Sequence, residues 1–209
     1  ETAGAVFKLA KRMGKMPIWQ KKEIAGFFTF RAGQASYEVQ TTTAKQWGWL
    51  STYPQAIYYA NRDDHKKKLV EQMTVGVAMN HNYKLGQLSA MSGNNVMGRS
   101  YTSDYPDRYE KEGPSASLWG YQFAEQFNYA IETDPEVIFV TGWNEWVAGR
   151  YKTWQGVSNA FPDQFNDYFS RDIEPPRGQL KDHYYYQMVS YIRRFKGTRA
   201  LPEASDAVT

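Results

Sequence analysis

The sequence predicts an α/β fold, either a barrel or a doubly wound sheet, and two observations predict it. Near-continuous apolar runs are typical of parallel strands that are covered on both faces. These runs share the chain with segments of helical periodicity. The 209 residues are enough for one domain with a substantial core. A complete (β/α)8 barrel of about 250 residues does not fit, whereas about half of one does.

Four apolar runs, each bounded by polar or turn residues, are the expected strands. They cover residues 24–30, 47–53, 73–79 and 137–142. The runs that begin at Met73 and Val137 are the clearest, because they are almost uninterrupted. The connection over 31–46 shows no helical period, and 55–72 contains only a short candidate helix at 63–71. A parallel crossover of this length does not have to be helical.

Three helices are expected besides that short candidate. Apolar residues at helical spacing over 1–13 predict the first, and because the chain opens inside it we expect the native polypeptide to continue before Glu1. A helix over 114–132 ends before Pro135, where proline blocks continuation. A helix over 182–196 ends at Gly197 after a cationic last turn.

Composition excludes several classes of function. A net charge of +3 disfavours a nucleic-acid partner, and no apolar stretch reaches the length of a membrane-spanning helix. The absence of cysteine removes disulfides, thiolate nucleophiles and zinc–thiolate sites. Phosphate-binding, serine-hydrolase and zinc-peptidase motifs are also missing. The 16% aromatic content suits sugar rings, which have an apolar face and a polar rim, although aromatic side chains also simply fill cores.

The strongest functional signal lies where the expected strand 137–142 ends. Trp143, Asn144, Glu145 and Trp146 follow it directly. In parallel α/β folds the carboxyl ends of strands carry the active site. A carboxyl group between two indole rings is partly desolvated, which raises its pKa and allows it to act as a general acid. The alternative is a structural glutamate paired with an arginine such as Arg150.

The sequence Phe-Val-Thr-Gly-Trp-Asn-Glu-Trp at 139–146 resembles the strand-end motif of the endo-α-mannosidase and endo-α-mannanase family of glycoside hydrolases and of its WbsX-like relatives. The stretch 163–175 is similar to the segment that follows this motif in related bacterial carbohydrate-degrading proteins. The resemblance implies the carboxyl-terminal half of a (β/α)8 barrel over residues 1–197, followed by a tail or linker over 198–209. It also implies a secreted, periplasmic or cell-surface protein, and a missing amino-terminal half of the same polypeptide.

One departure from that family concerns the catalytic pair. In the family a second glutamate follows the first by three residues, whereas this chain has Ala148 at that position. Canonical glycoside hydrolysis needs two carboxyl groups. The long loop after residue 79 offers Asp104 as the expected second carboxylate, with Asp107 and Glu110 as weaker candidates. For each of them a solvated loop charge is an equally good interpretation.

Further candidates for binding sugar follow other expected strands. They are Arg31, Tyr53, His81, Arg99 and Tyr101. Three histidines in separate contexts make no metal site, and Asp172, Glu174 and Asp182 lack the spacing of a calcium loop. We therefore expect no metal and no cofactor.

The leading hypothesis is a glycoside hydrolase-like protein that cleaves a glycosidic bond in a polysaccharide or glycan. Glu145 is the expected acid/base, and Asn144 orients it or binds a hydroxyl group. Trp143, Trp146, Tyr101 and Tyr53 are the expected sugar platform. The alternative is a non-catalytic carbohydrate-binding barrel, because Ala148 stands where the second carboxylate is expected.

Overall fold

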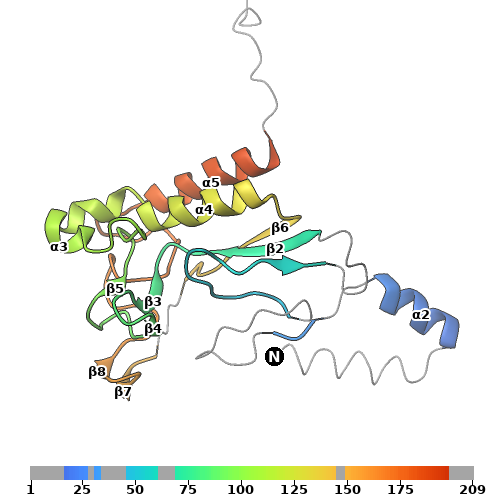
Figure 1. Ribbon diagram of the computed structural model, residues 1–209, viewed down its shortest axis with the longest axis horizontal. Coiled ribbons are helices and arrows are strands. Elements are labelled where there is room, and N and C mark those ends of the chain that lie inside the picture. The colour runs from blue at the N-terminus through green and yellow to red at the C-terminus, as the bar shows by residue number, and fades with distance from the viewer. Residues whose placement is uncertain (1–16, 28–30, 34–45, 61–68, 145–148, 198–209) are drawn as a thin grey trace, which may run out of the picture.

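The computed structural model describes residues 17–27, 31–33, 46–60, 69–144 and 149–197 (Figure 1). The helices in these ranges are α2 (Ile18–Phe27), α3 (Arg108–Glu112), the 3₁₀ helix η1 (Pro114–Leu118), α4 (Tyr121–Thr133) and α5 (His183–Lys196). The strands are β1 (Tyr58–Tyr59), β2 (Val70–Val75), β3 (Met79–Asn82), β4 (Gln87–Leu88), β5 (Val96–Met97), β6 (Val137–Val140), β7 (Tyr151–Trp154) and β8 (Val157–Ala160).

The strands form three small sheets. In the first, β2 lies between β1 and β6, with β1 antiparallel and β6 parallel to it. The parallel register places Gln72 opposite Val137 and Val75 opposite Val140. In the second sheet β3 is central and pairs with β4 and β5 in antiparallel fashion. The hairpin of β7 and β8 makes the third.

The prediction of a (β/α)8-barrel fold for this chain is wrong. The described residues form sheets of three, three and two strands, and β2 with β6 is their one parallel strand pair. The expected strands at 73–79 and 137–142 do pair with each other. The described residues of the other two apolar runs supply no strand to this sheet, so the part of the chain that the structure describes contains no series of parallel strands.

The run at 24–30 belongs to α2 as far as residue 27, and 28–30 lie outside the described residues. A short apolar run fits a helix or a strand equally well, which explains the error. The candidate helix at 63–71 is described only at its end, where β2 begins at Val70. The expected helix over 1–13 and the tail over 198–209 lie outside the described residues.

The run at 47–53 lies beside β2 without becoming a strand, because glutamine side chains form hydrogen bonds with its backbone amide and carbonyl groups. The Gln72 side chain accepts from the Gly48 amide at 3.0 Å and donates to the Gly48 carbonyl at 3.1 Å. Gln126 Nε2 donates to the Ser51 carbonyl at 2.9 Å. Since side chains replace the partner strand, no ladder forms here.

The run at 73–79 is divided between two sheets. β2 ends at Val75, and the Gly76 amide donates to Gln126 Oε1 of α4 at 2.8 Å instead of to a neighbouring strand. β3 then begins at Met79. A side chain from the covering helix therefore ends one strand and lets the chain turn into the next.

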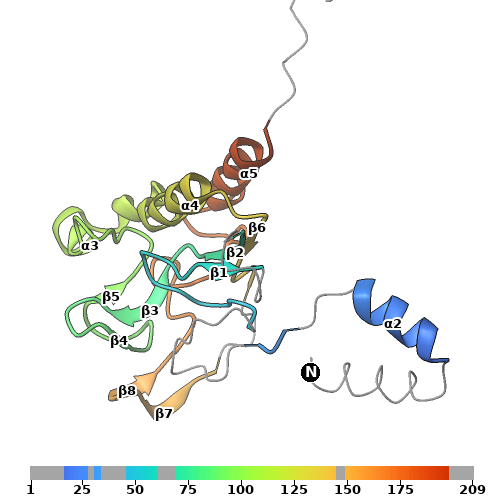
Figure 2. The same ribbon diagram turned by 45° about the vertical axis from the view of Figure 1, so that its right-hand side comes forward.

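The two helices that the sequence predicts best are confirmed. α5 runs to Lys196 and ends before Gly197. The segment 114–132 is helical but divided, because Gly120 has φ +63° between η1 and α4. α4 and α5 lie side by side over one face of the sheet of β1, β2 and β6 (Figures 1 and 2).

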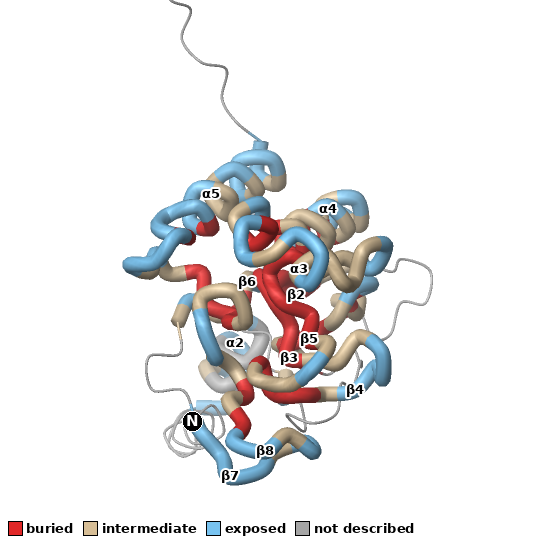
Figure 3. The backbone as a smooth tube through the Cα atoms, turned by 90° about the vertical axis from the view of Figure 1, so that its left-hand side faces the viewer, coloured by how far each residue is buried: buried red, intermediate tan, exposed pale blue. Residues whose placement is uncertain are grey.

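The main core lies between this sheet and the two helices. Met73 and Val75 of β2 pack with Phe123 and Phe127 of α4, and with Tyr184 of α5. The most continuously buried part of the backbone runs through β2 and β3 (Figure 3). Burying each large apolar side chain contributes about 1.5–3 kcal/mol, so this layer holds the two helices against the sheet.

β6 is not covered on both faces, contrary to the prediction. Ile138 and Val140 pack on the core, whereas Val137 is 49% and Phe139 45% exposed. β6 is an edge strand of its sheet. Its side chains point alternately to the core and to solvent, as successive side chains of a strand do. In the part of the chain that the structure describes, no helix is long and apolar enough to cross a membrane.

Candidate functional site

The chain beyond β6 turns sharply and meets a segment that lies thirty residues later in the sequence. Gly142 has φ +79°, which brings the backbone against residues 171–174. The Ile173 amide donates to the Gly142 carbonyl and the Glu174 amide to the Trp143 carbonyl, both at 2.9 Å. These bonds bring two acidic side chains, Asp172 and Glu174, to the carboxyl end of β6.

A cavity of about 530 Å³ opens at this junction. It is lined by Arg99, Asn144, Gln164, Asp167, Ser170, Asp172, Glu174, Pro175, Pro176 and Arg177. Asn144 Nδ2 donates to Glu174 Oε2 at 3.0 Å, so one carboxylate oxygen has a defined orientation. Carboxylates, amides and guanidinium groups that converge in one concavity are typical of a polar ligand site.

Arg99 builds the inner wall of this cavity. It is 2% exposed, and its Nε donates to the Asp167 carbonyl at 2.7 Å while an Nη donates to the Asp172 carbonyl. Its guanidinium lies over the Tyr184 ring, 4.3 Å from the centroid. Burial lowers the pKa of Arg99, and Tyr184, Asp172 and Asp167 oppose that change. Burial also raises the pKa of Tyr184 to about 12, so the phenol stays protonated beside the guanidinium.

His81 lies in β3 in a separate polar neighbourhood that contains Arg171. Burial lowers the pKa of His81 to about 4, and the positive charge of Arg171 adds to that effect. Arg171 is paired with Asp163 and lies over the Trp49 ring at 5.6 Å. The imidazole is therefore neutral at pH 7, and it can offer a hydrogen bond but no positive charge.

The structure brings Asn144 and Arg99 together in the cavity, but Asp104 is not among the residues that line it. Asp104 is exposed, next to Ser103, whose amide donates to Glu125 Oε1 at 2.8 Å. Asp107 is also outside the lining and pairs with Lys111 at 3.1 Å, and Glu110 is exposed.

The remaining expected sugar contacts have other neighbours. Tyr53 packs edge-on against Tyr129 of α4, with 5.5 Å between the ring centroids. Tyr101 packs against Tyr83 at 5.8 Å with the two rings tilted by 30°. Arg31 pairs with Glu71 near the amino end of β2, at the opposite end of the strand from the cavity. Trp143 is 47% exposed and packs edge-on against Tyr185 of α5.

The residues 145–148 lie outside the described part of the chain, so Glu145, Trp146 and Ala148 have no described surroundings. Arg150, the alternative structural partner of Glu145, donates through Nε to Asn159 Oδ1 at 2.7 Å.

Sequence reasoning missed Glu174 as a site residue, because it considered Asp172, Glu174 and Asp182 only as a calcium set. The structure places Asp182 in a different groove from the other two. Within the described ranges, no three histidine or acidic side chains are grouped so that they could hold a metal ion. The signal that could have found Glu174 is its place in the stretch 163–175, which stood out in the sequence without indicating a role for any one of its residues.

Comparison of the chain with protein-family models, with curated proteins and with solved structures finds no match. The cavity and its residues are therefore the basis for the functional proposal.

Proposed function

We propose that this protein hydrolyses a glycosidic bond in a polysaccharide or glycan at the cavity beyond β6. The observation that carries the proposal is the 3.0 Å hydrogen bond from Asn144 to Glu174. It orients a carboxylate in a concave site, and the residue that follows Asn144 is Glu145, the expected acid/base.

Glu174 replaces Asp104 in this proposal as the partner of Glu145. Canonical glycoside hydrolysis uses two carboxyl groups about 5 to 9 Å apart. Glu145 donates a proton to the glycosidic oxygen, so that the leaving sugar departs as a neutral alcohol. Glu174 acts at the anomeric carbon in one of two ways. As a nucleophile it forms a glycosyl ester, which water then cleaves while Glu145 takes the proton of that water; as a base it takes a proton from the water that adds to the anomeric carbon. Asn144 is a positioning residue for Glu174.

Other features of the cavity support a sugar ligand. Its lining carries hydrogen-bond donors on Arg99, Gln164 and Arg177 and acceptors on Asp167 and Asp172, which match the hydroxyl rim of a sugar. The half-exposed Trp143 adjoins Asn144 and offers an apolar face. Under this proposal the protein is secreted, periplasmic or at the cell surface, where it would meet extracellular polysaccharides.

A second candidate, a carbohydrate-binding protein without hydrolysis, is favoured by one feature. Ala148 stands where the resembling family has its second glutamate. The same cavity would then bind a glycan without turnover.

The test compares Glu174→Gln and Glu145→Gln with Asp104→Asn, a matched control because Asp104 is an exposed acid outside the cavity. Release of reducing ends is measured from a panel that contains α-mannan, β-glucan and host-type glycans. We expect each glutamine variant to lower kcat by about 100-fold or more and the control to match the parent protein.

Each outcome has a distinct meaning. Full activity in Glu174→Gln would reject Glu174 as the partner, and full activity in Glu145→Gln would reject the proposed acid. Binding of a panel glycan in calorimetry, with no reducing ends released by the parent protein, would reject hydrolysis in favour of the binding function. Neither binding nor turnover would reject both.

A further inference from the structure

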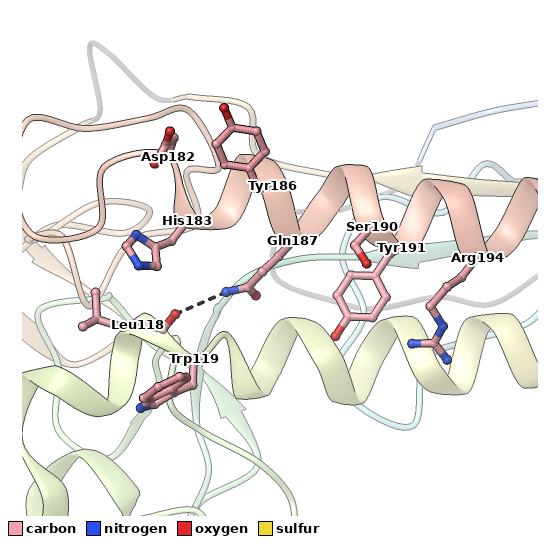
Figure 4. Close-up of a pocket in the computed structure, with 9 residues that line it drawn as sticks. All are labelled: Leu118, Trp119, Asp182, His183, Tyr186, Gln187, Ser190, Tyr191 and Arg194. Carbon is pink, nitrogen blue, oxygen red and sulfur yellow. Dashed lines mark hydrogen bonds between the residues drawn. The ribbon is translucent and has the colours of Figure 1, made fainter. Parts of the chain in front are cut away.

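A second concavity, of about 610 Å³, lies between the η1–α4 junction and α5 (Figure 4). Its lining includes the aromatic residues Trp119 and Tyr186 and the polar residues Gln187, Ser190 and Arg194. Trp119 is 67% and Tyr186 63% exposed. Two large exposed rings that line one concavity together with polar side chains make a candidate binding surface.

The polar side chains of this groove are held in place by the two helices. Gln187 Nε2 donates to the Leu118 carbonyl at 3.2 Å, the dashed line in Figure 4. Arg194 donates through an Nη to Asn128 Oδ1 of α4 at 3.1 Å. An amide has two donor hydrogens and a guanidinium has five, so each group retains donors for a ligand. Their orientation costs little entropy on binding, because these contacts already fix it.

A series of exposed rings joins this groove to the candidate active site. Trp143, next to Asn144, packs edge-on against Tyr185 with 6.3 Å between the ring centroids. Tyr185 packs edge-on against Tyr186 at 5.7 Å, and Tyr186 lines the groove. Trp143, Tyr185 and Tyr186 are 47%, 38% and 63% exposed. The rings therefore run along the surface from the end of β6 across the start of α5.

We propose that Trp143, Tyr185, Tyr186 and the groove beside Trp119 form a track that binds a polymeric glycan outside the cavity. The proposal rests on the proposed function and specifies its substrate as a chain of many sugars. Rings stack on the C–H faces of successive sugars, while Gln187, Ser190 and Arg194 bond to their hydroxyl groups.

The charges of the groove fit a neutral polymer better than a nucleic acid. Its lining carries the guanidinium of Arg194 together with the carboxylate of Asp182. Single-stranded nucleic acid also stacks on aromatic rings, but it requires a strongly positive groove that follows the phosphates. A mixed pair of charges supplies no such field.

The test uses the full chain in the Glu174→Gln background, so that binding is separated from turnover. Retardation in native gels that contain soluble α-mannan, β-glucan or xylan measures binding to a polymer. Trp119→Ala and Tyr186→Ala are compared with Trp19→Ala, a matched control because Trp19 is 66% exposed but lies on α2, away from α4 and α5 (Figures 1 and 2).

We expect each track variant to weaken polymer binding by about three- to tenfold, since an aromatic stacking contact contributes on this scale. The control is expected to bind like its parent, and Tyr186→Phe, which keeps the ring, is expected to retain most of the binding. In the active background, KM for the retained polymer should rise by a similar factor, and KM for a short oligosaccharide should not change.

Equal retardation of the parent and both alanine variants would overturn the track, as would failure of every polymer to retard the parent. Loss of retardation in Trp119→Ala and Tyr186→Ala would support the track even if the parent protein releases no reducing ends. The absence of released reducing ends would overturn only the hydrolytic proposal.

Discussion

Replacement of Gly142 by alanine tests the junction that forms the candidate site. Gly142 has φ +79°, and a Cβ built on it would overlap the Arg171 carbonyl oxygen and lie 3.1 Å from the Arg171 carbonyl carbon. Both neighbours are backbone atoms, so no side-chain rotation can make room. The segment 171–174 must therefore move away from the end of β6.

The cost has two physical parts. A residue with a Cβ in the left-handed region costs about 1–2 kcal/mol. Displacement of 171–174 weakens the two 2.9 Å hydrogen bonds from Ile173 to Gly142 and from Glu174 to Trp143. Each such bond contributes about 1 kcal/mol. We expect Gly142→Ala to lower the free energy of unfolding by about 3–4 kcal/mol in all.

Gly156→Ala is the matched control, because Gly156 has φ +75° but no atom within 4 Å of its built Cβ. It carries the backbone cost alone, about 1–2 kcal/mol. Urea unfolding followed by tryptophan fluorescence measures both variants. If the two costs agree within about 0.5 kcal/mol, residues 142 and 171 do not approach each other as closely as the structure indicates. Glycan hydrolysis should fall much further in Gly142→Ala, because Glu174 moves with its segment.

Three further changes test the histidine and the core. The pKa of His81 lies at about 4 in the folded chain, below its ordinary value of 6.5, so the unfolded state binds more protons between these values. The free energy of unfolding should therefore fall by at most about 3 kcal/mol as the pH drops from 6.5 to 4. Urea titrations over this pH range should show that the free energy of unfolding of His81→Asn depends less on pH than that of the parent protein. Phe127→Ala should lower the free energy of unfolding by about 3–5 kcal/mol in the same assay, because the ring is 1% exposed and stacks on Tyr191 at 4.5 Å. A loss below about 1 kcal/mol would contradict this packing. Gln126→Leu should lower the free energy of unfolding by about 2–4 kcal/mol, because the Gly76 amide and the Ser51 carbonyl lose their hydrogen-bond partner. An unchanged urea midpoint would show that these bonds do not hold the segment 47–53 in place.

Local pattern was enough wherever an element is specified by its own neighbours in sequence. The periodicity and Gly197 predict α5, and the apolar run at 137–142 predicts β6. Of the side chains expected to follow β6, Asn144 lines the cavity. Apolar content could not separate helix from strand at 24–27, and it could not reveal that Gln72 would replace a strand beside Gly48.

The tertiary structure alone decided which acid faces Asn144. Asp104 and Glu174 are both single carboxylates in loops, and nothing in their immediate neighbours ranks one above the other. The choice depends on backbone hydrogen bonds between 142–143 and 173–174, segments thirty residues apart. The sequence by itself determined which side chains were available for chemistry. Which of these side chains lie together was decided only when the chain folded and brought 173–174 against 142–143. A hydrogen bond between residues so far apart leaves no pattern in the sequence around either of them.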